Sequence, residues 1–222
     1  MITKAQEIVA MHNPHPYYET YKKFEESYWG FIPSYIASAV KEHFTVLDIG
    51  SAYGTLLAYC SLLGPCRLFA LDKYDYMSDQ FKVALGVEYI KDDIENPTKI
   101  PDMKFDVVIF TEILEHLNFN PLDTMKRLHD LITPEGYIVL STPNAATWGR
   151  LSNYTHWKDI PSFDSKVTAV DAHVYQYNIE ELMQLCAEAG LRPELVGLSG
   201  GFSNTKFDNI NMLLRRLDYV SM

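Results

Sequence analysis

The chain has 222 residues, of which 47% are hydrophobic and 22% are charged, the balance of an ordinary globular domain. Its net charge of −10 argues against attraction to a nucleic-acid backbone, because the phosphates would be repelled. The three cysteines form no C-x-x-C pair and the N-terminus has no apolar leader, so we expect a cytoplasmic protein with free thiols.

The first stretch, residues 1–43, is rich in aromatic side chains that follow a helical rhythm. These residues recur at steps of three and four: Tyr17, Tyr18, Tyr21, Phe24, Tyr28 and Trp29. Pro14 and Pro16 delimit the helix upstream, and a second helix is predicted over 34–42. We expect residues 1–43 to form a helical cap on a main domain that spans residues 44–222.

From residue 44 onward, short apolar runs alternate with helical segments. Buried strands are predicted over 44–50, 67–72, 87–90, 105–110 and 137–143, and two late strands over 191–200 and 210–220. Helices are predicted over 55–64, 122–132 and 179–190, the last of them capped by Asn178 and ended by Gly190. This alternation predicts an α/β fold with a mostly parallel sheet and helices on both faces. Ligands of such sheets bind beyond the carboxyl ends of the strands.

The segment after the first predicted strand reads DIGSAYG over residues 48–54. Gly50 and Gly54 allow the backbone to turn sharply and to approach a ligand closely. A dinucleotide fingerprint would carry glycine where Ala52 stands, and Asp48 would repel a pyrophosphate. The loop therefore suits a cationic ligand, such as a sulfonium or an ammonium group, and argues against an NAD-dependent dehydrogenase.

Acidic residues also follow the next two predicted strands. Asp72 stands about 20 residues beyond Gly50, the spacing at which an acid binds ribose hydroxyls. Asp93 and Ile94 follow the third strand, where the acid can accept from an exocyclic amine and the apolar residue can flank a purine ring.

Five motifs, taken in order, resemble those of the class I S-adenosylmethionine-dependent methyltransferases, including the ubiquinone-pathway O-methyltransferases and the type 11 and type 12 methyltransferases. They are VLDIGSAYG (46–54), LFALD (68–72), VEYIKDDIEN (87–96), FDVVIFTEILEHL (105–117) and LITPEGYIVLSTPN (131–144). The resemblance covers residues 44–196. It implies a Rossmann-like sheet of seven strands with the last strand antiparallel. It also implies S-adenosyl-L-methionine as the cofactor and S-adenosyl-L-homocysteine as its product.

Carried over position by position, the resemblance assigns ten residues to the cofactor: Asp48, Gly50, Ser51, Gly54, Asp72, Lys73, Asp93, Ile94, Thr111 and Glu112. Asp48 and Gly50 would approach its methionine part, and Asp72 would bind its ribose hydroxyls. The residues after the third strand would hold the adenine, and those after the fourth would line the sulfonium side. The family usually carries glycine at the position of Ala52.

A histidine is the usual base for removing a proton from a hydroxyl acceptor, and His116 and His173 are the candidates for catalysis. On a helix, Glu112, Glu115 and His116 would share one face beside the sulfonium. The sequence E-x-x-E-H at residues 112–116, followed by S-T-P-N and a later histidine, also resembles two metal-using subgroups. These are the ubiquinone-pathway O-methyltransferases and the small-RNA 3′-terminal 2′-O-methyltransferases. That resemblance implies four ligands: Glu112, Glu115, His116 and His173. The sequence EILEHL at residues 112–117 is also typical of class I methyltransferases that use no metal. We therefore assign no metal-binding residues, and a divalent ion stays an open alternative.

The connection over residues 144–177 is longer than ordinary loops of this kind. Its aromatic residues are Trp148, Tyr154, Trp157, Phe163, Tyr175 and Tyr177. We predict that this segment and the cap close over the cofactor as a lid and build a mostly apolar acceptor pocket. The alternative is that both pack outside the sheet or in a homodimer interface.

The expected function is methyl transfer to a small molecule: a hydroxyl group of a metabolite, a natural-product intermediate or a sugar. No run of apolar residues is long enough for a membrane span. Two alternatives remain, a metal-dependent 2′-O-methyltransferase acting on RNA and a noncatalytic scaffold that binds the cofactor. The absence of a lysine and arginine cluster ranks the RNA acceptor below the small molecule.

Overall fold

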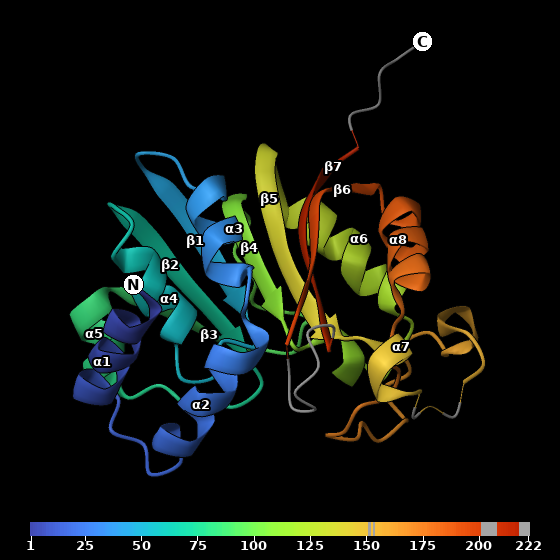
Figure 1. Cartoon of the computed structure of the whole chain (residues 1–222), viewed down its shortest axis with the longest axis horizontal. Coiled ribbons are helices and arrows are strands. Elements are labelled where there is room, and N and C mark those ends of the chain that lie inside the picture. The colour runs from blue at the N-terminus through green and yellow to red at the C-terminus, as the bar shows by residue number, and fades with distance from the viewer. Residues whose placement is uncertain (151, 153, 201–207, 218–222) are drawn as a thin grey trace.

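The computed structural model describes residues 1–150, 152, 154–200 and 208–217. Within them a single sheet has the strand order β3-β2-β1-β4-β5-β7-β6 (Figure 1). The strands are β1 (Phe44–Ile49), β2 (Cys66–Asp72), β3 (Val87–Lys91), β4 (Phe105–Thr111), β5 (Ile132–Pro143), β6 (Leu191–Ser199) and β7 (Asn209–Arg216). β7 runs antiparallel to both of its neighbours, and the first five strands pair in parallel. The predicted seven-stranded sheet with an antiparallel last strand is confirmed.

Helices cover both faces of this sheet. In the described part of the chain they are α1 (Ile2–His12), α2 (Tyr18–Tyr28), α3 (Ile32–Ala39), α4 (Thr55–Ser61), α5 (Asp79–Leu85), α6 (Pro121–Leu131), α7 (Ala145–Trp148) and α8 (Ile179–Glu188). α6 and α8 pack on one face, and α1, α3, α4 and α5 pack on the other. Figure 1 shows α2 at the end of the sheet toward which β1, β2 and β4 point.

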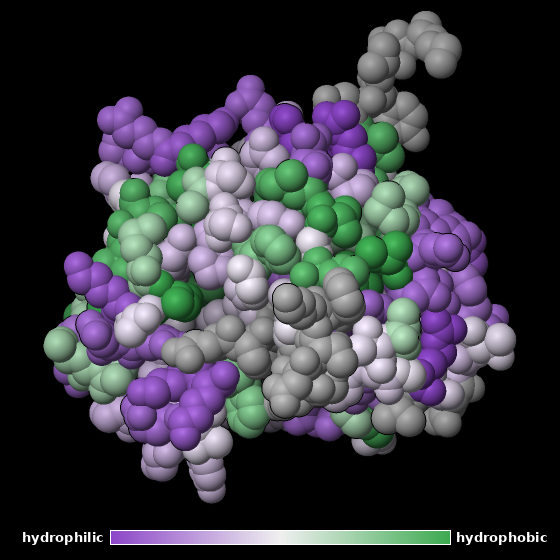
Figure 2. Space-filling view, in the orientation of Figure 1, coloured by the Kyte–Doolittle hydropathy of each residue, from purple (hydrophilic) through white to green (hydrophobic). Residues whose placement is uncertain are grey.

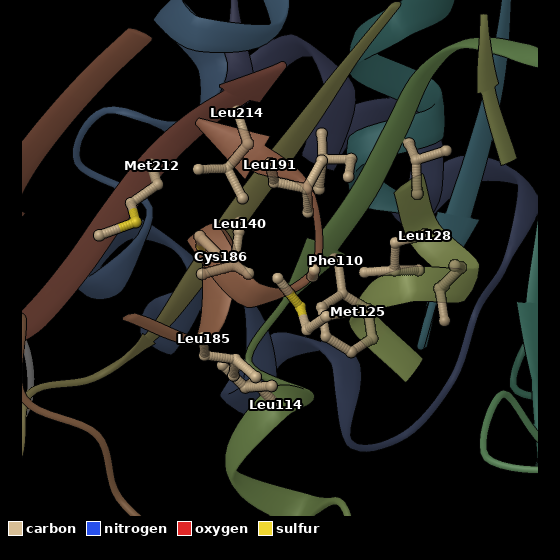
Figure 3. Close-up of a cluster of buried hydrophobic side chains, with 14 of the residues drawn as sticks. Phe110, Leu114, Met125, Leu128, Leu140, Leu185, Cys186, Leu191, Met212 and Leu214 are labelled. Carbon is tan, nitrogen blue, oxygen red and sulfur yellow. The ribbon is translucent and has the colours of Figure 1, made fainter. Parts of the chain in front are cut away.

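Two apolar cores, one on each face, hold these layers together. Side chains alternate along a strand, so Val108 and Phe110 of β4 point toward α6 and α8, whereas Val107 and Ile109 point toward α3 and α4. All four are fully buried. Figure 3 shows the first core, where Phe110 lies against Met125 of α6 and near residues of α8 and β7. Strands covered on both sides need largely continuous apolar runs, which is why these strands are predictable from the sequence.

Three helices lie outside the sequence prediction: α1, α5 and the single turn α7, whose N-cap is Asn144. α1 buries only small apolar side chains, Ala5 and Val9, against its neighbours, so its helical stripe is weak. α5 is seven residues long; the Ser78 hydroxyl accepts from the Phe81 N–H at 3.1 Å, and Gly86 ends the helix with φ +66°. The signals for α5 were therefore local caps, not periodicity.

Among the described residues, element boundaries differ from prediction by three residues or more in three places. α3 lies two to three residues before the predicted 34–42 helix, and α4 ends at Ser61. β5 begins at Ile132 because the chain pairs with β4 on both sides of a register shift. Residues 218–220 of the last predicted strand lie outside the described residues.

β6 forms one edge of the sheet. It pairs with β7 alone, and its register shifts between Pro193 and Leu195.

Figure 2 shows apolar residues gathered over the upper middle of this view, with polar residues around them. Among the described residues, no helix is long and apolar enough to cross a membrane.

Candidate active site

A cavity of about 600 Å³ opens where β1, β2, β3 and β4 end. Its walls are the segments that directly follow these strands, together with Tyr21 of α2 and residues 169–171. This volume lies in the range that small-molecule sites occupy, roughly 300–1,000 Å³. The cavity therefore sits at the sheet edge where the sequence predicted a ligand.

Most of the predicted site residues meet in this cavity. Its lining includes Gly50, Asp72, Lys73, Asp93, Ile94, Thr111, Glu112 and His116. Asp48 and Ser51 line a smaller cavity of about 20 Å³, which shares Gly50, Thr111 and Glu112 with the large one. Gly54 and His173 line neither: Gly54 is the N-cap of α4, and His173 packs on His116.

The loop after β1 holds three residues in the left-handed region of backbone conformation. Gly50 has φ +72° and Gly54 has φ +84°, which glycine adopts without strain. Ala52 has φ +43° although it carries a Cβ atom, and its N–H donates to Asp72 Oδ2 at 3.0 Å. The loop thus carries Ala52 where the family that the chain resembles usually has glycine. The left-handed conformation of this alanine costs about 1–2 kcal/mol.

Asp72, at the end of β2, connects that loop to the next one. Its Oδ1 accepts from the Tyr74 N–H at 3.0 Å, while Oδ2 accepts from Ala52. Burial raises the pKa of Asp72, and the backbone donors oppose this increase. Each carboxylate oxygen keeps a second lone pair, so Asp72 can still accept from a ligand hydroxyl in the cavity.

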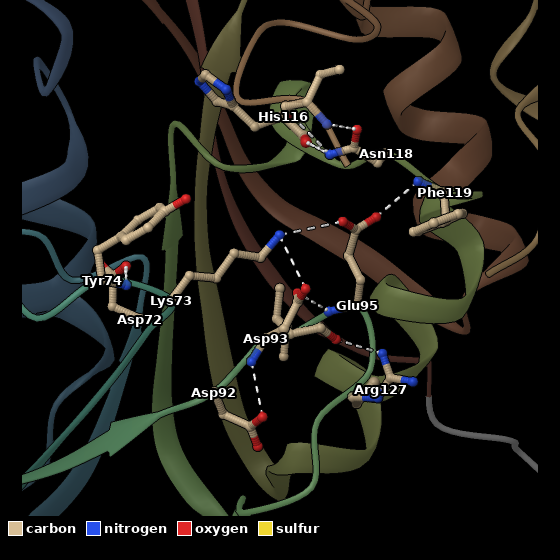
Figure 4. Close-up of polar contacts among 12 residues, drawn as sticks. Asp72, Lys73, Tyr74, Asp92, Asp93, Glu95, His116, Asn118, Phe119 and Arg127 are labelled. Carbon is tan, nitrogen blue, oxygen red and sulfur yellow. Dashed lines mark hydrogen bonds and ion pairs between the residues drawn. The ribbon is translucent and has the colours of Figure 1, made fainter. Parts of the chain in front are cut away.

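The loop after β3 is organised by ion pairs and backbone hydrogen bonds (Figure 4). Lys73 Nζ lies 3.1 Å from Asp93 Oδ2 and 3.6 Å from Glu95 Oε2. Asp93 Oδ1 accepts from the Glu95 N–H at 2.9 Å. Asp92 instead accepts from the N–H groups of Thr98 and Lys99, which lowers its pKa against the effect of burial. Asp93 is therefore the acid of this pair that forms an ion pair with a side chain in the described structure.

The prediction that Glu112, Glu115 and His116 share one helical face is wrong. Glu112 has φ +55°, and only a single 3₁₀ turn, Leu114–His116, follows it. The Glu112 carboxylate accepts from Ser141 Oγ at 2.6 Å and from Asn209 Nδ2 at 3.0 Å. Loss of solvent raises the pKa of Glu112 to about 7. A left-handed residue at the end of β4 cannot start an α-helix, which separates Glu112 from the two residues after it.

Glu115, His116 and His173 form a compact group beside the cavity. The Glu115 carboxylate accepts from Thr142 Oγ1 at 2.9 Å, and the two imidazole rings lie 4.7 Å apart between centroids. One ligand atom from each of the three residues lies within 4.8 Å of the others. A carboxylate with two imidazoles could hold a divalent transition metal ion. In the described part of the chain Glu112 does not join this group, so the set of four implied by the resemblance is not assembled.

Both histidines are disposed to be neutral. Burial lowers the pKa of His116, with a smaller effect from the charge of His173, and burial also lowers the pKa of His173. Nδ1 of His116 is buried and has no hydrogen-bond partner in the described structure. A neutral imidazole that lines the cavity can accept a proton there.

Sequence reasoning missed three tyrosines of the cavity wall, Tyr53, Tyr74 and Tyr76, whereas Tyr21 belongs to the cap whose aromatic residues were expected to border the pocket. Tyr21, Tyr53, Tyr74 and Tyr76 line it, and the Tyr53 ring centroid lies 4.9 Å from that of Tyr21 and 5.6 Å from that of Tyr76. We call these four residues the tyrosine wall. Three of them directly follow β1 or β2, so their position after a strand was the available signal.

The aromatic residues of 144–177 lie elsewhere. Of the six that the sequence suggested, none lines the large cavity, and Trp157, Tyr175 and Tyr177 are at most 1% exposed in the core under α8. The segment reaches the cavity through residues 169–171 instead. Val170 is held there by Asn118, whose side-chain amide donates to the Val170 carbonyl at 3.1 Å and accepts from its N–H at 2.7 Å.

A family model described as a methyltransferase domain matches residues 21–196. A search of curated proteins finds no match. The chain is similar in structure to the 1,6-didemethyltoxoflavin-N1-methyltransferase of Burkholderia thailandensis, with bound 1,6-didemethyltoxoflavin and S-adenosylhomocysteine. The TM-score is 0.68 at 15% identity, over 98% of this chain and 88% of that one.

Two further solved structures resemble the chain. An S-adenosylmethionine-dependent methyltransferase from Mesorhizobium loti has a TM-score of 0.61 at 15% identity, over 82% of this chain and 95% of that one. An O-methyltransferase from neocarzinostatin biosynthesis, in complex with S-adenosylhomocysteine and 1,4-dihydroxy-2-naphthoic acid, has a TM-score of 0.55 at 16% identity, over 88% and 55%. At these identities the likeness concerns the fold.

Proposed function

Because the chain belongs to the methyltransferase-domain family and is a class I S-adenosylmethionine-dependent methyltransferase, we propose that it methylates a hydroxyl group of a small molecule. The observation that carries the proposal is the position of His116. Its imidazole has a lowered pKa and lines the same cavity as the loops after β1, β2 and β3. Methyl donor and proton acceptor would therefore meet in one cavity.

The residues of the cavity fit S-adenosylmethionine. Ser51 Oγ is buried without a hydrogen-bond partner in the described structure, so a polar ligand group would satisfy it. Asp72 and Glu112 bring carboxylates to the lining, and carboxylates suit a cationic ligand. We propose Asp72 for the ribose hydroxyls, with Asp93 and Ile94 around the adenine.

When bound, S-adenosylmethionine supplies a methyl group on a positively charged sulfur atom. The chain has two tasks, to align the acceptor oxygen with that methyl group and to take the proton of the acceptor. The first falls to the tyrosine wall and to residues 169–171, which border the cavity. The second falls to His116, which is neutral near pH 7 and therefore able to receive a proton.

The tyrosine wall favours a small acceptor with an aromatic ring. Tyrosine rings offer flat apolar faces with a polar tip, and such faces stack on planar ligands. Two structural neighbours hold planar ring compounds as well, although one of them methylates nitrogen. The net charge of −10 makes an RNA acceptor the weaker alternative. The three cysteines are free thiols, in keeping with a proposed cytoplasmic location.

The test compares His116→Gln with His43→Gln, a variant of an exposed histidine. Against a panel of phenols and aromatic amines, we expect the wild type to methylate a phenol and His116→Gln to lose roughly 10²–10⁴-fold in kcat. Binding of S-adenosylhomocysteine should stay unchanged in both variants. A phenol methylated at the wild-type rate by His116→Gln would contradict the role of this base.

The group of Glu115, His116 and His173 supports a second candidate, methyl transfer that depends on a divalent ion. A chelator arm in the same assay separates the two. Loss of activity with the chelator, reversed by a divalent ion, would favour the metal-dependent reaction. Undiminished activity with the chelator would favour the metal-free base.

A further inference from the structure

The connection between α1 and α2, residues 13–17, precedes the segment 21–196 that the family model matches. α1 packs on α4 and α5, the helices that the loops after β1 and β2 lead into (Figure 1). Three residues of the tyrosine wall, Tyr53, Tyr74 and Tyr76, belong to these two loops. The connection is therefore placed to hold the wall from the side of the cap.

Asn13 binds both loops with one side chain. The residue is 3% exposed. Its Nδ2 donates to the Tyr76 carbonyl at 2.9 Å and, over a longer distance of 3.4 Å, to the Tyr53 carbonyl. Its Oδ1 accepts from the Ser78 N–H at 2.9 Å. An amide side chain offers two donor hydrogens and an acceptor oxygen, and both ends of this one bind backbone groups of the two loops. Asn13 thus fixes the backbone at Tyr53 relative to the backbone at Tyr76.

A second contact holds the end of α1 in the same place. Ser78 Oγ donates to the His12 carbonyl at 2.6 Å, and the same oxygen accepts from the Phe81 N–H at the start of α5 at 3.1 Å. Buried polar networks whose members are hydrogen-bonded make a structure rigid and favour one arrangement over its alternatives. The cap and the loop after β2 are therefore held in one defined arrangement.

The rings of the wall pack around Tyr53, which is only 7% exposed. The distances from its ring centroid are 4.9 Å to His15, 5.4 Å to Tyr18, 4.9 Å to Tyr21 and 5.6 Å to Tyr76. The His15 ring also meets Tyr76 edge-on, at 6.5 Å between centroids. Tyr76 is 38% exposed and lines the cavity, so a ligand can contact it while the rings around Tyr53 hold it in position.

We propose that Asn13 is a positioning residue for the acceptor, because it fixes the carbonyl groups of Tyr53 and Tyr76 and thereby the shape of the tyrosine wall that a flat acceptor contacts. His15 supports the rings of the same two tyrosines. The inference rests on the proposed function, since it takes the wall to contact the acceptor. It goes beyond that function in making acceptor binding depend on two residues of the cap, outside the five motifs and outside the matched segment.

The test is steady-state methylation by the full chain, with 2-naphthol, a flat phenol of two rings, as the acceptor probe. The proteins are wild type, Asn13→Ala, His15→Ala and the control Gln6→Ala. Gln6 is 5% exposed and also binds through a side-chain amide, but its Nε2 donates within the cap, to the Lys22 carbonyl at 3.2 Å and to the Glu25 carboxylate at 3.1 Å. Gln6→Ala therefore removes the same kind of group from α1 without removing a bond to Tyr53 or Tyr76.

We expect Asn13→Ala to raise the KM for 2-naphthol roughly tenfold, because each of the two lost bonds to the wall contributes a few-fold. His15→Ala should raise this KM about threefold through the lost ring contacts, and Gln6→Ala should leave it unchanged. In Asn13→Ala, kcat should change less than KM. The Kd of S-adenosylhomocysteine should also stay close to the wild-type value, because Asp72 still binds the N–H groups of Ala52 and Tyr74.

An unchanged KM in Asn13→Ala would overturn the inference. An equal rise in Gln6→Ala would overturn it as well, because the effect would then be a general loosening of the cap. If Asn13→Ala does not fold, His15→Ala decides in the same way. Wild-type turnover of 2-naphthol with no rise in KM in the variants contradicts the inference alone. A wild type that binds S-adenosylhomocysteine but does not methylate 2-naphthol contradicts the proposed function for flat phenols, and the inference fails with it.

Discussion

The substitution Gly50→Ala places a methyl group where an added Cβ has almost no room. Gly50 has φ +72°, and an added Cβ would lie 2.0 Å from Ile113 Cδ1 and 2.5 Å from Cγ1. The left-handed conformation costs about 1–2 kcal/mol for a residue with a side chain. Displacing Ile113 costs about 1–3 kcal/mol more, the usual range for overpacking. We expect the free energy of unfolding to fall by about 2–5 kcal/mol.

Gly86→Ala is the matched control. Gly86 has φ +66°, but an added Cβ would meet nothing within 4 Å, so only the conformational cost of about 1–2 kcal/mol applies. Adding Ile113→Ala to Gly50→Ala should return the packing cost, because the nearest remaining Ile113 atom, its Cβ, is 3.9 Å away. The double variant should therefore be more stable than the sum of the single changes predicts.

Urea unfolding of the ligand-free protein, followed by circular dichroism, measures Gly50→Ala, Gly86→Ala, Ile113→Ala and the double variant. At this chain length about 1 kcal/mol corresponds to roughly 2–4 °C in Tm, so thermal melts provide a second readout. If Gly50→Ala is no less stable than Gly86→Ala, the contact with Ile113 carries no cost and the reasoning is refuted. Strict additivity in the double variant would refute it as well.

Two further predictions concern the acids of the site. Glu112→Gln should raise the Tm of the ligand-free protein at pH 8.5 and change it little at pH 5. Burial raises the pKa of Glu112 from 4.5 to about 7, so the stability that its protonated form contributes is lost as the pH rises through about 7; parallel melting curves across pH would contradict this. Asp72→Asn should weaken S-adenosylhomocysteine binding roughly tenfold or more in calorimetry. The change removes the negative charge and one of the two carboxylate oxygens that accept from the N–H groups of Ala52 and Tyr74. An unchanged Kd would argue against contact with the ribose.

Sequence patterns located the central strands because β1, β2, β4 and the second half of β5 are mostly apolar, buried runs. The N-cap at Asn178 was predicted for the same local reason, and the structure shows a capping box with Glu181. The acids after β2 and β3 follow directly from their place at a strand end. Features determined within a few residues of the chain were therefore accessible without coordinates.

Long-range packing accounts for what the sequence did not reveal. Asn209 reaches Glu112 only because β7 inserts between β5 and β6, which brings residues from far along the chain beside the end of β4. Trp157 and Tyr175 are aromatic residues like those of the tyrosine wall, but they pack in the core under α8 and do not line the cavity. Composition alone cannot tell these two uses of an aromatic ring apart. The left-handed backbone of Glu112 has no sequence signal, since only a few per cent of residues other than glycine adopt it.

The edge strand β6 has a consequence for how copies of the chain can meet. A second sheet adding a strand there would find no N–H at Pro193 and a shifted register directly after it. Arg192 and Glu194, paired at 3.1 Å, put charges on either side of the proline. Exposed edges without such features invite intermolecular pairing and aggregation. β6 is thus protected at its start against growth into a larger sheet, even though Leu195 and Val196 are exposed beyond it.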